Sequence, residues 1–125
     1  MVVFFNYKSR SKYSNKKVTF NGIKFDSSGE MRRYAELKVL EKAGELRNLV
    51  TQPRFLLQDK FQYKGQVQRA IEYVADFKYD LKVDGEWVPY VEDFKGYKTD
   101  IYRLKKKLFI FKYGDSYEFI ESSSK

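Results

Sequence analysis

The alternation of apolar and polar positions predicts several short strands. VTF and IKF flank Asn21-Gly22, which predicts a β-hairpin over residues 18–25 with a type I′ turn. A second two-residue turn, Asp84-Gly85, joins two alternating stretches, residues 69–82 and 86–95, which we expect to pair as long strands. Shorter apolar stretches predict two more strands, at residues 53–57 and 117–121.

Two further segments have the spacing of helices. The first begins at Ser27, which precedes Glu30 by three residues as in a capping box, and ends before Gly44. Tyr34 and Leu37 then share the face of Glu30. The second begins after Thr99 and ends at Gly114, and we expect four of its residues to face the core: Ile101, Leu104, Leu108 and Phe111. The element order predicts an α/β protein with a small mixed sheet and a helix packed on it.

Composition narrows the possible chemistry. The chain has 125 residues, enough for one domain. It contains no Cys and no His, which excludes disulfides, zinc–thiolate sites and Ser-His-Asp triads. Hydrolytic chemistry would therefore use carboxylates, Lys, Tyr or a hard metal ion held by oxygen atoms. Neither a signal peptide nor an apolar run near the ~20 residues of a membrane span is found, so we expect an intracellular protein.

The positive charge is concentrated in two places. The whole chain has a net charge of +8, and its first 25 residues hold six basic groups and no acid. This predicts a flexible basic arm, residues 1–17, ahead of a single domain at residues 18–125. A second cluster lies in and before the second helix. Two interpretations of this charge stay open: it binds nucleic acid, or it belongs to a tail that is merely solvated. The candidate DNA contacts are Lys8, Arg10, Lys12, Lys16, Lys17, Lys98, Lys105 and Lys106.

The Asp84-Gly85 turn also sets a register. A two-residue loop pairs Val83 with Glu86, which places Asp76 opposite Asp93 in a non-hydrogen-bonded pair with Cα atoms ~4.5 Å apart. Lys95 lies on the face of Asp93. Two opposed carboxylates repel each other, and Mg²⁺ would offset that cost. The alternative is a solvated face on which Asp93 simply pairs with Lys95.

These residues stand in the order found in nucleases with the PD-(D/E)-x-K core, which the sequence resembles. Glu30 lies in the first helix, Asp76 late in the second strand, and Asp93-Phe94-Lys95 in the third. Ala75 stands where the superfamily's name has Pro. Four segments more closely resemble an uncharacterised phage-encoded endonuclease family: FDSSGEMRRYAELKVLEKAGEL, TQPRF, YVADFKY and VEDFKGYKTDIYRLKKKLF.

The resemblance implies a restriction-endonuclease-like αβββαβ core and a Mg²⁺- or Mn²⁺-dependent DNA endonuclease. Asp76, Asp93 and the Phe94 carbonyl would ligate the metal, Lys95 would serve the attacking water, and Glu30 would complete the metal shell or hold a second ion. From its spacing alone, Glu30 could equally be a capping-box residue. Gln52 is a weaker candidate for the site. Glu92, next to Asp93, stays open as an alternative ligand.

The substrate and the setting are also expectations from the resemblance. Archaeal-type Holliday-junction resolvases share this core and are dimeric, which favours branched DNA as substrate and a homodimer. We expect exposed aromatic residues at the dimer interface, such as Phe109 and Tyr113. The likeness to a phage-encoded family implies a phage- or prophage-encoded protein in the bacterial cytoplasm. The alternative is a DNA-binding or inhibitor protein whose nuclease core is inactive.

Overall fold

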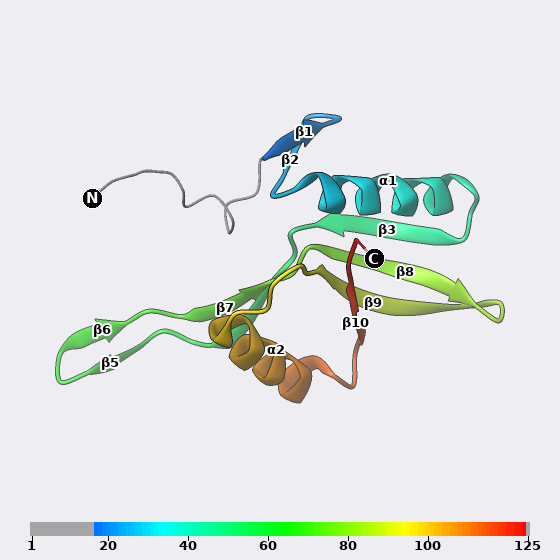
Figure 1. Ribbon diagram of the computed structural model, residues 1–125. Coiled ribbons are helices and arrows are strands. Elements are labelled where there is room, and N and C mark those ends of the chain that lie inside the picture. Colours follow the sequence, from blue (N-terminus) through cyan, green and yellow to red (C-terminus); the bar gives the residue numbers. More distant parts are fainter. Residues whose placement is uncertain (1–16, 125) are drawn as a thin grey trace, which may run out of the picture. The chain divides into compact units, whose positions relative to one another are not determined.

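The computed structural model describes residues 17–124 and is a mixed α+β protein (Figure 1). The described residues form two compact units, residues 17–36 and 37–124. The described elements are β1 (Val18–Phe20), β2 (Ile23–Phe25), α1 (Ser28–Lys42), β3 (Leu46–Thr51), β4 (Arg54–Gln58), β5 (Phe61–Tyr63), β6 (Gln66–Gln68), β7 (Ile71–Val74), β8 (Phe77–Val83), β9 (Glu86–Phe94), α2 (Asp100–Tyr113) and β10 (Glu118–Ser122).

The described part of the first unit is the predicted hairpin followed by the start of α1. Strands β1 and β2 pair from Val18–Phe25 to Phe20–Ile23. Asn21 and Gly22 have positive φ angles of 53° and 77°, as a type I′ turn requires. The Ser27 hydroxyl accepts a hydrogen bond from the Glu30 amide at 3.1 Å, which confirms the predicted cap.

Helix α1 ends as its sequence predicts, in a Schellman motif. The Glu45 amide donates to the Leu40 carbonyl at 3.0 Å, and the Gly44 amide donates to the Glu41 carbonyl at 3.1 Å. Gly44 has φ of 81°, a left-handed conformation in which a side chain would be strained.

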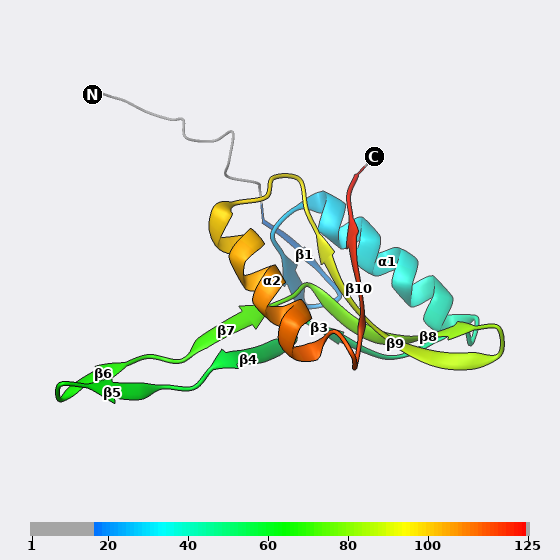
Figure 2. The ribbon, with the colours of Figure 1, turned by 90° about the horizontal axis from the view of Figure 1, so that it is seen from below.

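The second unit contains a four-stranded sheet in the order β10-β9-β8-β3. Strands β8 and β9 are antiparallel in the predicted register, from Val83–Glu86 to Phe77–Glu92. Strand β3 adds to β8 antiparallel, and β10 returns after α2 to lie parallel to β9. Figures 1 and 2 show the crossover through α2.

The prediction of one long strand over residues 69–82 is wrong in one respect. It is divided at Ala75-Asp76 into β7, which pairs with β4, and β8, which pairs with β3 and β9. The short hairpin β5–β6 connects β4 to β7, and the sequence pattern did not indicate it. The pattern did not indicate β3 either. Buried residues alternate unchanged through the division, at Tyr73, Ala75, Phe77 and Tyr79, so the pattern does not reveal the change of partner.

Helix α2 packs an aromatic face against β4 and β7. Thr99 caps it as predicted, because its hydroxyl accepts a hydrogen bond from the Tyr102 amide at 3.0 Å. The buried residues of the helix are Tyr102 and Phe109, which join a core of Phe55, Tyr73, Ala75 and Val91. The predicted core stripe was therefore wrong: Ile101, Leu104, Leu108 and Phe111 are all exposed. Three aromatic residues lie on the inner face instead. They are Tyr102, Phe109 and Tyr113, at intervals of seven and four residues.

Candidate active site

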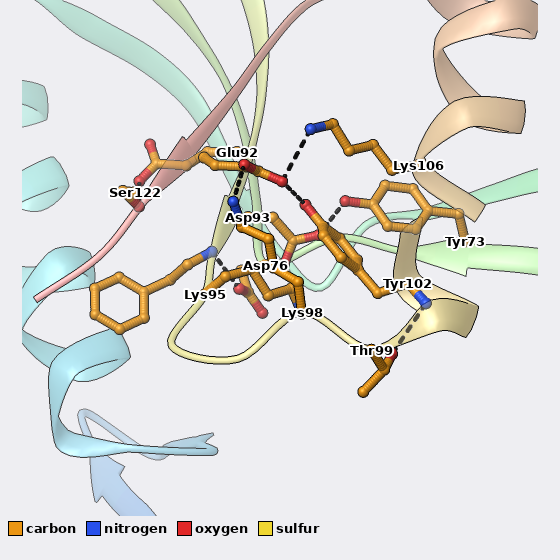
Figure 3. Close-up of polar contacts among 12 residues, drawn as sticks. Tyr73, Asp76, Glu92, Asp93, Lys95, Lys98, Thr99, Tyr102, Lys106 and Ser122 are labelled. Carbon is orange, nitrogen blue, oxygen red and sulfur yellow. Dashed lines mark hydrogen bonds and ion pairs between the residues drawn. The ribbon is translucent and has the colours of Figure 1, made fainter. Parts of the chain in front are cut away.

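Asp76 lies at the junction of the β4–β7 ladder and the main sheet. The regular pairing of β8 with β9 stops at Phe77–Glu92, and the Asp76 amide also donates to the Glu92 carbonyl, at 3.2 Å. Asp76 and Phe77 thus both lie against Glu92, as in a β-bulge, so the simple Asp76–Asp93 pair expected from the register is not formed. Instead, an Asp76 carboxylate oxygen, Oδ2, accepts a hydrogen bond from the Phe94 amide at 2.7 Å. Asp76 is therefore held beside the end of β9 that carries Asp93 (Figure 3).

Asp93 is a buried carboxylate whose two oxygens differ. Its side chain is 1% exposed. Oδ2 accepts a hydrogen bond from the Tyr73 hydroxyl, whereas Oδ1 accepts none from any of residues 17–124. The ammonium of Lys95 lies 3.2 Å from Oδ1, close enough for an ion pair although its geometry is not that of a hydrogen bond. A buried carboxylate oxygen is costly unless a positive charge lies beside it, and here the Lys95 ammonium supplies that charge while leaving the oxygen without a hydrogen-bond donor to compete with a metal ion.

Tyr73 acts here as a fixed hydrogen-bond donor. Burial raises the pKa of its hydroxyl well above the ordinary value, and the charge of Asp93 and the hydrogen bond to it raise it further. The ring is held by Phe109, 5.2 Å away between centroids, and by Phe55 at 6.4 Å. Tyr73 therefore stays protonated and fixes the orientation of the Asp93 carboxylate.

Lys95 is held at both ends. Its amide donates to the Ser122 carbonyl of β10 at 2.8 Å. Its ammonium lies 4.5 Å from the centroid of the Tyr102 ring, a cation–π contact, in addition to its pairing with Asp93. The side chain is 27% exposed, so the ammonium is positioned yet still reachable by water.

Glu92 and Asp93 have different surroundings. Both oxygens of Glu92 accept hydrogen bonds, from the Tyr79 hydroxyl at 2.6 Å and from the Ser122 hydroxyl at 2.5 Å. Glu92 is fully buried and belongs to a hydroxyl network. Asp93 keeps an oxygen without a donor among residues 17–124 and has Lys95 beside it, which favours Asp93 over Glu92 as the carboxylate that could hold a cation.

An open pocket of about 470 Å³ is lined in part by Tyr102, the residue whose ring contacts the Lys95 ammonium. Glu121 is one of its lining residues. It accepts hydrogen bonds from Tyr102 at 2.5 Å and from Lys106 at 3.1 Å, and it pairs with Lys98 at 3.0 Å. Burial would raise the pKa of Glu121, but these three donors outweigh it and lower the pKa to about 2. The pocket lining is strongly basic and consists of Lys98, Tyr102, Arg103, Lys106, Lys107, Ile110 and Glu121.

Residues 10–125 match the model of a family described as "Protein of unknown function (DUF1064)". The chain belongs to this family. The comparisons with curated proteins and with solved structures found no match. In the described part of the chain, no helix is long and apolar enough to cross a membrane.

The other predicted site residues of this DUF1064 protein differ in where they lie. Lys98 and Lys106 line the basic pocket, whereas Lys105 is half-buried on α2 and does not. Gln52 approaches Asp76 through the backbone only, because its amide donates to the Asp76 carbonyl at 2.9 Å. Glu30 is buried, but it belongs to the first unit. Four predicted DNA contacts lie outside the described residues: Lys8, Arg10, Lys12 and Lys16.

Sequence reasoning missed the tyrosines of the site. Tyr73, Tyr79 and Tyr102 each donate a hydroxyl hydrogen bond to an acid, Asp93, Glu92 and Glu121 respectively. Two features of the sequence could have indicated them: the high aromatic content, 18% of the chain, and an excess of acids over bases on the predicted strands. Tyr combines an apolar ring with a polar tip, so it can serve the core and a buried acid together.

The donor set around Asp93 fits Mg²⁺ better than an ion that needs a full protein cage. Within residues 17–124, no group of three or more acids, Cys or His is arranged to hold a metal. Mg²⁺ is usually held by one or two carboxylates and keeps several waters. Asp76 and Asp93, with the Phe94 carbonyl, would supply such a partial shell, and Asp93 Oδ1 accepts no hydrogen bond within the same residues.

Proposed function

We propose that this protein is a Mg²⁺-dependent DNA endonuclease with a PD-(D/E)-x-K site. The observation that carries the proposal is Asp93: a buried carboxylate with one oxygen lacking a donor among residues 17–124, 3.2 Å from the Lys95 ammonium. The order Asp76, then Asp93-Phe94-Lys95, supports the same assignment. The restriction-endonuclease-like core and the role of Glu30 stay predictions.

In this proposal each residue of the site has a separate task. Asp76 and Asp93 hold the ion, which when bound supplies charge stabilisation at the phosphate and lowers the pKa of water. Tyr73 keeps the Asp93 carboxylate in one orientation. Lys95, held over the Tyr102 ring, orients the attacking water, and after its ammonium has released a proton to solvent the neutral amine would accept the proton of that water.

The basic pocket would receive the DNA strand. Its four basic side chains, Lys98, Arg103, Lys106 and Lys107, suit phosphate groups, and Tyr102 connects it to Lys95 through the cation–π contact. Glu121 keeps Lys98 and Lys106 together while no phosphate is bound. Because these contacts address phosphates and not base edges, we propose selection by DNA structure, with branched or four-way junction DNA as the substrate class.

A homodimer would suit a junction with two strands to cut, but its interface needs revision. Phe109, which we expected there, is fully buried in the core, and Tyr113 is half-buried with its hydroxyl donating to the Leu56 carbonyl at 2.9 Å. Neither residue is available to a partner in the way that was predicted. The homodimer itself stays a prediction.

The test compares cleavage by Asp93→Asn with cleavage by a matched control. Asp80→Asn is that control, because Asp80 lies on β8 and pairs with Arg47 at 3.1 Å, away from Asp93. With Mg²⁺ and a fixed four-way junction, wild type and Asp80→Asn should cut, whereas Asp93→Asn should bind the junction and leave it intact. Cleavage by the Asp93→Asn variant at the wild-type rate would refute the assignment of Asp93 to the active site.

The same experiment separates the alternatives. Wild-type protein that binds the junction and never cuts it, with Mg²⁺ or Mn²⁺, would favour the inactive DNA-binding protein. Cleavage of linear duplex at a defined base sequence by a monomer would instead indicate a restriction-type enzyme.

A further inference from the structure

Helix α2 has a second apolar face that points away from the core. Four large apolar side chains on it are exposed: Ile101 by 65%, Leu104 by 57%, Leu108 by 38% and Phe111 by 89%. They are spaced by three, four and three residues, so they form one continuous stripe along the helix. An exposed stripe of this kind is the signature of an interaction surface.

The stripe has the spacing of positions a and d in a coiled-coil heptad. With Ile101 at a, Leu104 falls at d, Leu108 at the next a and Phe111 at the next d. The positions that flank such a seam, e and g, decide partner choice through their charges. Here they are almost entirely basic, since they hold Lys105, Lys112, Lys107 and the single acid Asp100.

These flanking charges disfavour a second copy of the chain as the occupant. In a parallel pair, g of one helix faces e of the other, which opposes Lys107 to Lys112 and leaves Asp100 with Lys105 as the one favourable pair. In an antiparallel pair, e faces e, which opposes Lys105 to Lys112. Asp100 is the one flanking acid, and it lies at the first turn of the helix, 3.6 Å from Arg103.

The width of the stripe disfavours a membrane surface. Helices that lie in a lipid interface have a broad apolar face, whereas an a and d stripe is the narrower seam of helix pairing. The opposite side of α2 is occupied as well, because it packs against β4 and β7.

We propose that the α2 stripe docks an amphipathic helix of another protein, one with apolar residues at a and d and with Asp or Glu at e and g. Apolar contacts along the seam would meet Leu104 and Phe111. The acids would pair with Lys105, with Lys107, which also lines the basic pocket, and with Lys112, whose ammonium donates to the Leu56 carbonyl at 2.9 Å. Helix α2 is already formed and held by the core, so binding orders little of this protein. The proposal does not depend on nuclease activity.

The test uses two synthetic three-heptad peptides with Leu at a and d. One has Glu at e and g and the other has Lys there, and both are measured by fluorescence anisotropy with the full chain. The Glu peptide should bind roughly tenfold or more tightly than the Lys peptide at low salt, and the difference should shrink as salt rises.

Variants then locate the binding surface. Phe111→Ser and Leu104→Ser should each weaken binding of the Glu peptide roughly tenfold or more, as expected for central apolar contacts. Val39→Ser is the matched control, because Val39 is a similarly exposed apolar residue (67%) on α1, and it should bind as wild type does. All three side chains are exposed, and thermal unfolding of each variant verifies that the fold is kept.

Three outcomes would overturn the proposal. The first is equal binding of the Glu and Lys peptides, or no effect of Phe111→Ser. The second is binding to phosphatidylserine–phosphatidylcholine vesicles that Phe111→Ser abolishes, without binding of the Glu peptide, which would make the stripe a lipid contact. The third is a dimer in sedimentation equilibrium that Phe111→Ser dissociates, which would make a second copy the occupant.

Discussion

Replacing Tyr73 with Phe is expected to separate the two roles of this residue. The ring should stay in place, because it is packed between Phe55 and Phe109, and Phe preserves those contacts. The hydroxyl is removed, so both oxygens of Asp93 would lack a hydrogen bond from residues 17–124 while the side chain stays 1% exposed. A hydrogen bond to a charged group contributes about 1.5–3 kcal/mol, so the free energy of unfolding should fall by about 2 kcal/mol.

Two measurements follow for Tyr73→Phe. In a chain of 125 residues, about 2 kcal/mol corresponds to a fall in Tm of roughly 8 °C, which thermal unfolding detects. If Tyr73 orients a metal-binding carboxylate, the Mg²⁺ concentration needed for half-maximal cleavage should rise by about 10–100-fold.

Tyr113→Phe is the matched control for this prediction. Its hydroxyl lies in the same aromatic core but donates to a neutral acceptor, the Leu56 carbonyl. We expect a loss near 1 kcal/mol and an unchanged Mg²⁺ requirement. A Tyr73→Phe variant that matches wild type in both Tm and Mg²⁺ requirement would refute the assigned role of Tyr73.

Three further predictions concern charged groups. Lys95→Arg should keep the fold and lose most cleavage activity, because Arg cannot give up a proton; an equally active variant would mean that the residue supplies charge alone. Glu121 has a folded pKa near 2, below its ordinary 4.5, so it stabilises the fold above pH 4.5 and this contribution disappears as the pH falls toward 2. Glu121→Gln should accordingly show a shallower loss of stability over that range in urea titrations, and identical slopes would contradict the assignment. Deleting residues 1–17 should lower the slope of log affinity against log salt by ~0.9 for each DNA phosphate that the arm neutralises, and an unchanged slope would leave the arm without a DNA role.

Local signals in the sequence predicted local structure well. Asn21-Gly22 and Asp84-Gly85 each fix a turn through a positive φ, and the resulting register of β8 with β9 is correct to Phe77–Glu92. Ser27, Gly44 and Thr99 cap helices because their backbone or hydroxyl geometry is decided within a few residues.

Long-range partners were not predictable in the same way. The alternation of residues 69–82 records which side is buried, but not that β7 pairs with β4 while β8 pairs with β3 and β9. The division falls at Asp76. The Asp76 amide donates to the Glu92 carbonyl, as in a β-bulge, and the Asp76 carboxylate accepts a hydrogen bond from the Phe94 amide in place of the expected pairing with Asp93. Helix α2 has two faces that satisfy the same spacing rule, and only packing decides that Tyr102 and Phe109 lie inside.

The tyrosines connect the core of the second unit with its charged sites. Burying an acid is costly unless it finds a donor, and Lys or Arg would bring a second buried charge with its own desolvation cost. A Tyr hydroxyl meets the need without adding a charge, while its ring fills the core. Tyr73 and Tyr102 belong to the cluster with Phe109, yet their hydroxyls hold Asp93 and Glu121. Ring packing and carboxylate orientation are therefore set by the same side chains, so substitutions that loosen this core should also misplace the carboxylates.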